Sequence, residues 1–108
     1  MTNELTPREA DALVREGDAQ LVDVREPFER EAGRIAGSRH VQLEDLPAEA
    51  GSLDRERPIV FYCRTGHRSA MAAQAFAASG FDARNLDGGL EAWVAAGLPI
   101  EPEDGRVA

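Results

Sequence analysis

The chain contains no lysine and a single cysteine, Cys63, among its 108 residues. All 12 basic residues are arginines, so catalysis through a lysine Schiff base is excluded. A lone cysteine cannot form an internal disulfide, which excludes a disulfide-stapled secreted scaffold and leads us to expect a reducing compartment such as the cytoplasm. No apolar run approaches the roughly 18 residues that a membrane span requires, so no membrane partner is expected.

Basic charge is scarce as well. The 20 acidic residues outnumber the 12 basic ones and give a formal net charge of −8. Such an acidic chain is a poor partner for nucleic acid or an anionic membrane. Acidic side chains are in turn missing from one stretch, from Arg57 through Phe81, which contains Arg57, Arg64 and Arg68. We therefore expect a positive field near Cys63 that attracts a small anion.

Short apolar segments alternate with segments that carry helix signals. Strands are expected at 19–24, 40–43, 59–62 and 83–86, and helices or helical turns at 7–16, 27–31, 46–50, 69–79 and 90–96. This alternation predicts one α/β domain over residues 1–108, with a central, mainly parallel sheet flanked by helices on both faces. The acidic tail from about residue 101 is expected to fray. Ligands of such sheets bind at the carboxyl ends of the strands.

Cys63 lies between the most apolar predicted strand, 59–62, and the alanine-rich helix that follows. Taken alone, such a cysteine is more often a small core residue than a nucleophile. Gly66, however, lets the loop curl so that successive N–H groups converge on the sulfur, while Arg64 and Arg68 add positive charge. Ser69 is expected to cap the helix. Because these features favour a thiolate over a thiol, Cys63 is predicted to be a nucleophile.

The loop Cys63-Arg64-Thr65-Gly66-His67-Arg68-Ser69 resembles the active-site loop of the rhodanese (sulfurtransferase) family, commonly Cys-Arg-Ser-Gly-x-Arg-Ser. The segment 22–26, Val-Asp-Val-Arg-Glu, is similar to the first strand motif of that family. The segment 33–38 is similar to its Gly-His-Ile-x-Gly-Ala loop, with Arg34 in place of the usual histidine. The segment 86–93 is similar to its closing Gly-Gly-x-x-x-Trp motif. These four motifs occur in the family's order and extend over most of the chain.

The resemblance implies a rhodanese-like fold and a transferase that moves sulfane sulfur through a persulfide on Cys63. The donor would be thiosulfate or a similar small anion, and the acceptor would be cyanide or a thiol. Because the chain has no second cysteine to resolve the persulfide, the acceptor must come from outside, either as a small molecule or as a sulfur-relay protein. No cofactor is expected.

The resemblance also assigns roles to residues. Cys63 would be the catalytic residue, and the rest of the loop would bind the donor: Arg64, Thr65, Gly66, His67, Arg68 and Ser69. The guanidinium groups would oppose the donor's charge. Asp23 and Arg25 are expected to support the site structurally, Arg25 by pairing with a carboxylate and Asp23 by ordering nearby loop amides. His67 is expected to line the site.

Three alternatives stay open. Phosphatases and arsenate reductases also use a cysteine loop that ends in arginine, but four residues separate Cys63 from Arg68, whereas the related phosphatases use a loop longer by one. A non-catalytic binding or regulatory module, or a persulfide carrier for a partner protein, would keep the fold without turnover. A metal site formed by Cys63, His67 and His40 is disfavoured because it has few strong ligands and two arginines nearby.

Overall fold

The computed structural model describes residues 3–108; Met1 and Thr2, which belong to the expected domain, lie outside the described residues. Five strands form one sheet in the order β1-β5-β4-β2-β3, and all paired neighbours are parallel. The strands are β1 Glu4–Leu5, β2 Gln20–Asp23, β3 Arg39–His40, β4 Ile59–Tyr62 and β5 Ala83–Leu86. The helices are α1 Pro7–Arg15, α2 Pro27–Ala32, α3 Leu46–Glu49, α4 His67–Ala78 and α5 Gly89–Ala95.

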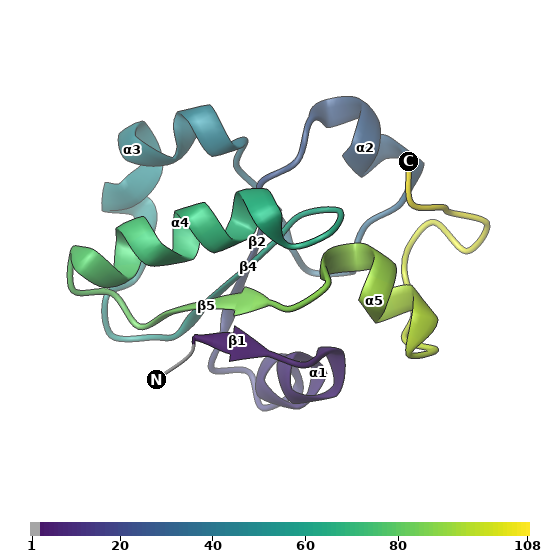
Figure 1. The fold of residues 1–108 in the computed structure, drawn as a ribbon, viewed down its shortest axis with the longest axis horizontal. Coiled ribbons are helices and arrows are strands. Elements are labelled where there is room, and N and C mark those ends of the chain that lie inside the picture. The colour runs from purple at the N-terminus through teal and green to yellow at the C-terminus, as the bar shows by residue number, and fades with distance from the viewer. Residues whose placement is uncertain (1–2) are drawn as a thin grey trace.

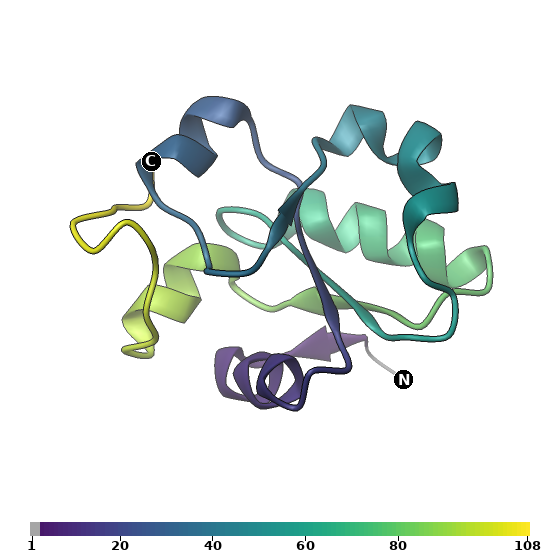
Figure 2. The same cartoon turned by 180° about the vertical axis from the view of Figure 1, so that it is seen from behind.

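Helices cover both faces of the sheet, as expected for this fold class (Figures 1 and 2). The central strand β4 is buried along its whole length, and its side chains alternate between two hydrophobic clusters. Ile59 and Phe61 pack with side chains of α3 and α4, whereas Val60 and Tyr62 pack with side chains of α1 and α5. A strand buried on both faces has no polar side, which explains the unbroken apolar run in the sequence. The prediction of a parallel sheet between two helical layers is confirmed.

The local signals place most helices within a few residues of their observed bounds. Thr6 caps α1 through a reciprocal pair of hydrogen bonds with Glu9, and Pro7 occupies the first helical position. Helix α4 begins at His67 with Gly66 as its N-cap, so the expectation that Ser69 caps this helix is wrong. Ser69 lies inside the first turn of α4, where its hydroxyl is free to bond elsewhere. None of the helices in residues 3–108 is both long and apolar enough to cross a membrane.

The C-terminal segment is not frayed, contrary to expectation. The backbones of Arg34 and Glu101 exchange two hydrogen bonds of 2.9 and 2.8 Å, and the Arg106 N–H donates to the carbonyl of Ala32 at 2.9 Å. The side chain of Val107 packs against the hydrophobic cluster that lies between the sheet and the helices α1 and α5. The acidic composition suggested a solvated tail, but its backbone bonds join it to the end of α2 and to the segment that follows (Figure 1), and Val107 anchors it to the core.

Candidate active site

The carboxyl ends of β2 and β4 meet at one edge of the sheet. Asp23 is in register with Tyr62, so the residues after these two strands, Val24 and Cys63, leave the sheet side by side. Helix α2 follows β2 and helix α4 follows β4 at this same edge. This is the edge at which parallel sheets bind ligands, and it holds the loop in which the sequence places the nucleophile.

The Cys63 sulfur points into the loop that follows it. It accepts a hydrogen bond from the Gly66 N–H at 3.1 Å and one from the Ser69 hydroxyl at 3.3 Å. Gly66 has φ of +101°, a conformation that residues with a Cβ rarely adopt, and this turn aims the backbone N–H back at the sulfur. The sulfur is thus held by one main-chain donor of the predicted cradle, the Gly66 N–H, together with a side-chain hydroxyl.

Cys63 itself is fully buried. Burial alone would raise the pKa of its thiol, because a thiolate loses solvation there. Hydrogen bonds from the Ser69 hydroxyl and from the backbone N–H groups of Ser69, Gly66 and Thr65 outweigh that effect and hold the pKa of Cys63 below the usual thiol value. A core cysteine needs no such donors, so the geometry favours an anionic sulfur over a packing role.

The N-terminus of α5 holds the loop from its other side. The N–H groups of Leu90 and Glu91 donate to the carbonyls of Cys63 and Arg64 at 2.8 and 3.1 Å. Gly89 has φ of +62°, and a Cβ at this position would lie 2.5 Å from the Arg64 carbonyl oxygen. The Gly88-Gly89 turn is thus required for α5 to approach the loop backbone this closely.

Asn85, at the end of β5, also fixes the loop and was not singled out by the sequence. Its side-chain amide donates to the Gly66 carbonyl at 3.2 Å and to the Glu4 carboxylate at 2.9 Å. Asn85 is buried, and this bond anchors the residue whose N–H reaches the sulfur. Its strand, Ala-Arg-Asn-Leu, has two polar residues between two apolar ones, and no local pattern marks Asn85 as a site residue.

The positive field expected around the loop is largely offset by carboxylates from other elements. Arg68 makes two hydrogen bonds of 2.8 Å to Glu29 in α2, and Glu29 is only 5% exposed. Arg64 pairs with Glu91 in α5 at 3.0 Å, with both side chains about half exposed. The stretch 57–81 contains no acidic residue of its own, but the fold places carboxylates of α2 and α5 next to its arginines. The local composition of the sequence does not predict these contacts.

Asp23 and Arg25 form a buried pair behind the loop. The Arg25 guanidinium donates to both Asp23 carboxylate oxygens at 2.9 and 2.8 Å and to the Gly33 carbonyl at 2.7 Å. Asp23 also accepts the Arg25 backbone N–H and the Tyr62 hydroxyl. Burial would lower the pKa of Arg25, but its bonds to Asp23 raise it. The pair has the expected geometry of a structural support.

The remaining loop residues lie at the surface. Thr65 and His67 are exposed, and His67 is the first residue of α4. His40 points elsewhere, with its Nε2 atom 2.7 Å from the Arg25 carbonyl oxygen. Within residues 3–108 no three His, Cys, Asp or Glu side chains cluster as metal ligands would.

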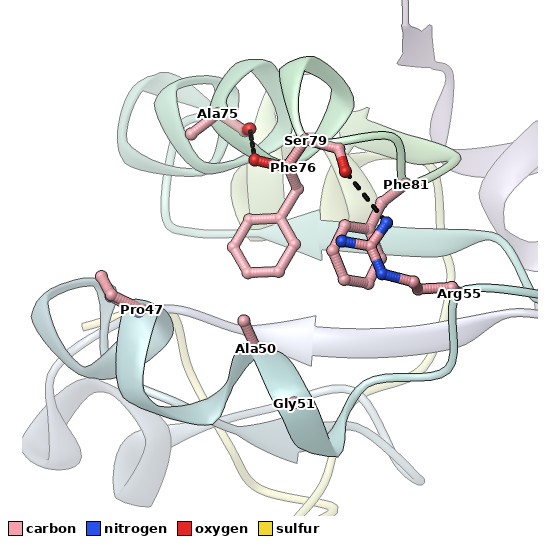
Figure 3. A pocket seen from close by; sticks show the side chains of 8 residues that line it. All are labelled: Pro47, Ala50, Gly51, Arg55, Ala75, Phe76, Ser79 and Phe81. Carbon is pink, nitrogen blue, oxygen red and sulfur yellow. Dashed lines mark hydrogen bonds between the residues drawn. The ribbon is translucent and has the colours of Figure 1, made fainter.

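A separate groove opens at the far end of α4 (Figure 3). It has a volume of about 360 Å³ and its walls are mainly apolar, with Phe76 and Phe81 at its base and Arg55 at its rim. The Arg55 guanidinium is already engaged by the Ser79 carbonyl at 2.9 Å and by the Phe81 ring, 4.2 Å away. No residue of the cysteine loop lines this groove, so it is distinct from the site at Cys63.

The fold and the site together define a parallel α/β domain with a cysteine loop at the carboxyl end of its central strand. The sequence model of the rhodanese-like domain matches residues 6–96, and the chain belongs to this family. The thiosulfate sulfurtransferase GlpE of Pseudomonas aeruginosa (strain LESB58) is 39% identical over 90 residues, which cover 82% of this chain and 81% of that protein. This similarity supports a rhodanese-type sulfurtransferase.

Solved structures agree on the fold. A rhodanese-related protein from Thermoplasma volcanium superimposes with a TM-score of 0.83 at 27% identity, covering 90% of this chain and 95% of the other. A protein from Rhodopseudomonas palustris, described as a possible tyrosine phosphatase, superimposes with a TM-score of 0.81 at 33% identity, covering 93% of this chain and 85% of the other. The fold alone therefore does not distinguish sulfur transfer from phosphoryl transfer, and the distinction depends on the cysteine loop.

Proposed function

We propose that this protein is a sulfurtransferase that carries sulfane sulfur from thiosulfate or a similar donor to cyanide or a thiol through a persulfide on Cys63. The observation that carries the proposal is the Cys63 sulfur held by the Gly66 N–H and the Ser69 hydroxyl. Donors aimed at a sulfur anion stabilise the attacking thiolate and the persulfide anion alike.

The first step is a displacement at the donor's outer sulfur. The Cys63 thiolate attacks that sulfur, a new S–S bond forms, the S–S bond of thiosulfate breaks, and its electron pair leaves with sulfite. In the second step cyanide attacks the outer sulfur of the persulfide, which releases thiocyanate and restores the thiolate. Neither step requires a net redox change or a proton, so His67 needs no acid–base role.

The loop residues have distinct parts in this proposal. Gly66 and Ser69 hold the sulfur, while the exposed residues Arg64, Thr65 and His67 form the rim that a donor must pass to reach the buried thiol. Arg68 precedes Ser69, its side chain is one-third exposed, and the charge of Cys63 raises its pKa, so its guanidinium is assigned to meet the donor.

Two other functions are weaker. A phosphatase requires a loop wide enough for a tetrahedral phosphate, whereas only four residues separate Cys63 from Arg68, one fewer than in the related phosphatases. A binding module has no need for a reactive thiol, whereas the lowered pKa of Cys63 is a feature of reacting thiols. A persulfide carrier would need the same thiol, and turnover distinguishes it from an enzyme. A working free thiol also suits a reducing compartment, and we propose the cytoplasm.

The proposal is tested by turnover. The wild-type protein is expected to form thiocyanate from thiosulfate and cyanide, while Cys63→Ser is expected to fall to the background rate, because a serine hydroxyl accepts no sulfane sulfur under these conditions. Hydrolysis of an aryl phosphate is measured in parallel. Phosphate release without thiocyanate formation would replace the sulfurtransferase with a phosphatase, and neither product would favour the binding module.

A further inference from the structure

The Arg68 guanidinium, one residue before the Ser69 hydroxyl that bonds the thiol, is paired with a side chain from another helix. Glu29 in α2 receives both arms of the Arg68 guanidinium at 2.8 Å, a geometry that a planar, two-oxygen anionic ligand would also use. Glu29 is nearly fully buried, whereas the Arg68 side chain is one-third exposed. The buried carboxylate therefore holds the guanidinium from the protein interior, while part of the Arg68 side chain stays open to solvent.

Glu29 is itself held in place. Its Oε1 atom accepts the Glu26 backbone N–H at 2.9 Å at the start of α2, so the carboxylate is fixed before it meets Arg68. Hydrogen bonds from Arg68, with help from this N–H and against the effect of burial, lower the pKa of Glu29. The carboxylate is thus charged near neutral pH, where it does not release Arg68 by taking up a proton.

Arg68 also lies within the field of the thiolate. The hydrogen bonds to Glu29 raise the pKa of Arg68 most, and the charges of Glu29 and Cys63 raise it further. The charge of Asp23 adds to this effect, so the guanidinium is under the influence of three anionic groups before any donor arrives. A donor with two negative charges meets a site whose local charge is close to neutral or negative, which penalises a dianion more than a monoanion.

We propose that Glu29 is a specificity-determining residue that holds Arg68 and so biases the site toward sulfur donors of low negative charge. This inference rests on the proposed sulfur transfer at Cys63. The donors it favours are monoanions and persulfides of thiols, and the donor it disfavours is the thiosulfate dianion.

Two probes separate charge from chemistry. Thiosulfate carries two negative charges, and methanethiosulfonate carries the same transferable sulfur with one. In both cases the Cys63 thiolate attacks the outer sulfur, the S–S bond of the donor breaks, and sulfite or methanesulfinate leaves with the electron pair. The quantity measured is the ratio of kcat/KM for thiosulfate to kcat/KM for methanethiosulfonate, with cyanide as the acceptor.

Glu29→Gln keeps one acceptor oxygen for the Glu26 N–H and removes the charge. The variant is expected to raise the thiosulfate-to-methanethiosulfonate ratio about tenfold, because Arg68 regains its full charge toward the donor. A partly unfolded population lowers both rate constants equally, so the ratio stays valid if the variant is less stable. Arg68→Ala in the Glu29→Gln background should return the ratio to the wild-type value, since the gain depends on Arg68.

The second ion pair of the loop provides a matched control. Glu91→Gln makes the same substitution opposite Arg64, but that pair is half exposed and screened by water, so the ratio should stay within about twofold of the wild type. An unchanged ratio in Glu29→Gln, or an equal rise in Glu91→Gln, would overturn the role of Glu29 while leaving sulfur transfer intact. Failure of the wild-type protein to transfer sulfur from either probe would instead overturn the proposed function, and with it this inference.

Discussion

At the scale of single residues, the reactivity of Cys63 depends on a few donors that oppose its burial. The Ser69 hydroxyl is one of them, at 3.3 Å from the sulfur. Ser69→Ala removes this donor, so the pKa of Cys63 should rise and the thiolate fraction at neutral pH should fall. We expect alkylation by a small reagent at pH 7 to slow about tenfold, as loss of a hydrogen bond to a charged group predicts.

The measurement is the alkylation rate as a function of pH. The midpoint for the wild-type protein should lie below the value of about 8.5 found for a free thiol, and the midpoint for Ser69→Ala should move upward. Ser79→Ala is the matched control, because Ser79 caps the other end of the same helix and its hydroxyl donates to the Ala75 carbonyl, away from Cys63. Equal midpoints for the wild type and Ser69→Ala would show that the hydroxyl does not stabilise the thiolate.

The sequence predicted some of these residues and missed others for a physical reason. Cys63 and Gly66 could be predicted from the sequence because their roles are local: the glycine turn and the thiol are three residues apart. Glu29 and Asn85 could not be predicted from the sequence, because their partners are distant along the chain. Glu29 contacts Arg68, 39 residues away, and Asn85 contacts Gly66, 19 residues away. Contacts of this kind are set by sheet order, which no local pattern encodes.

At the scale of elements, the site depends on α5 as much as on its own loop. Gly89→Ala would place a methyl group 2.5 Å from the Arg64 carbonyl, at a positive φ that alanine tolerates poorly. We expect the free energy of unfolding to fall by about 1–3 kcal/mol and α5 to shift away from the loop. The melting temperature and the rate of sulfur transfer check this, and both should decrease.

Gly51→Ala provides the comparison for Gly89→Ala. Nothing lies within 4 Å of a Cβ built at Gly51, and its backbone has no positive φ. The free energy of unfolding of Gly51→Ala should therefore differ from that of the wild-type protein by no more than about 0.5 kcal/mol. If Gly89→Ala were equally harmless, the close approach of α5 to the loop would not be needed for the site.

Strand signals were reliable for long buried runs and failed for short ones. The run 59–62 is predicted as the central strand because its consecutive residues are apolar, and the structure buries all four of them. Strand β1 has only two residues and no apolar run, so it was missed; its place in the sheet comes from pairing with β5. The predicted strand 40–43 shortens to Arg39–His40, because the chain turns into a 3-10 helix at Leu43.

At the scale of the whole molecule, the alternation of strands and helices was sufficient to predict a parallel α/β domain and the edge that carries the site. The charge distribution was not predictable in the same way. The chain as a whole is acidic, and the fold sets carboxylates of α2 and α5 against the arginines of the loop. The local absence of acidic residues in the sequence therefore overstated the positive field at Cys63.

The central claim is that the Cys63 sulfur accepts sulfane sulfur from a donor. Intact-mass measurement after incubation with thiosulfate or methanethiosulfonate tests it most directly. The wild-type protein should gain the mass of one sulfur atom, cyanide should remove it, and Cys63→Ser should gain nothing. An absence of the adduct with both donors, or an adduct that persists in Cys63→Ser, would contradict the account.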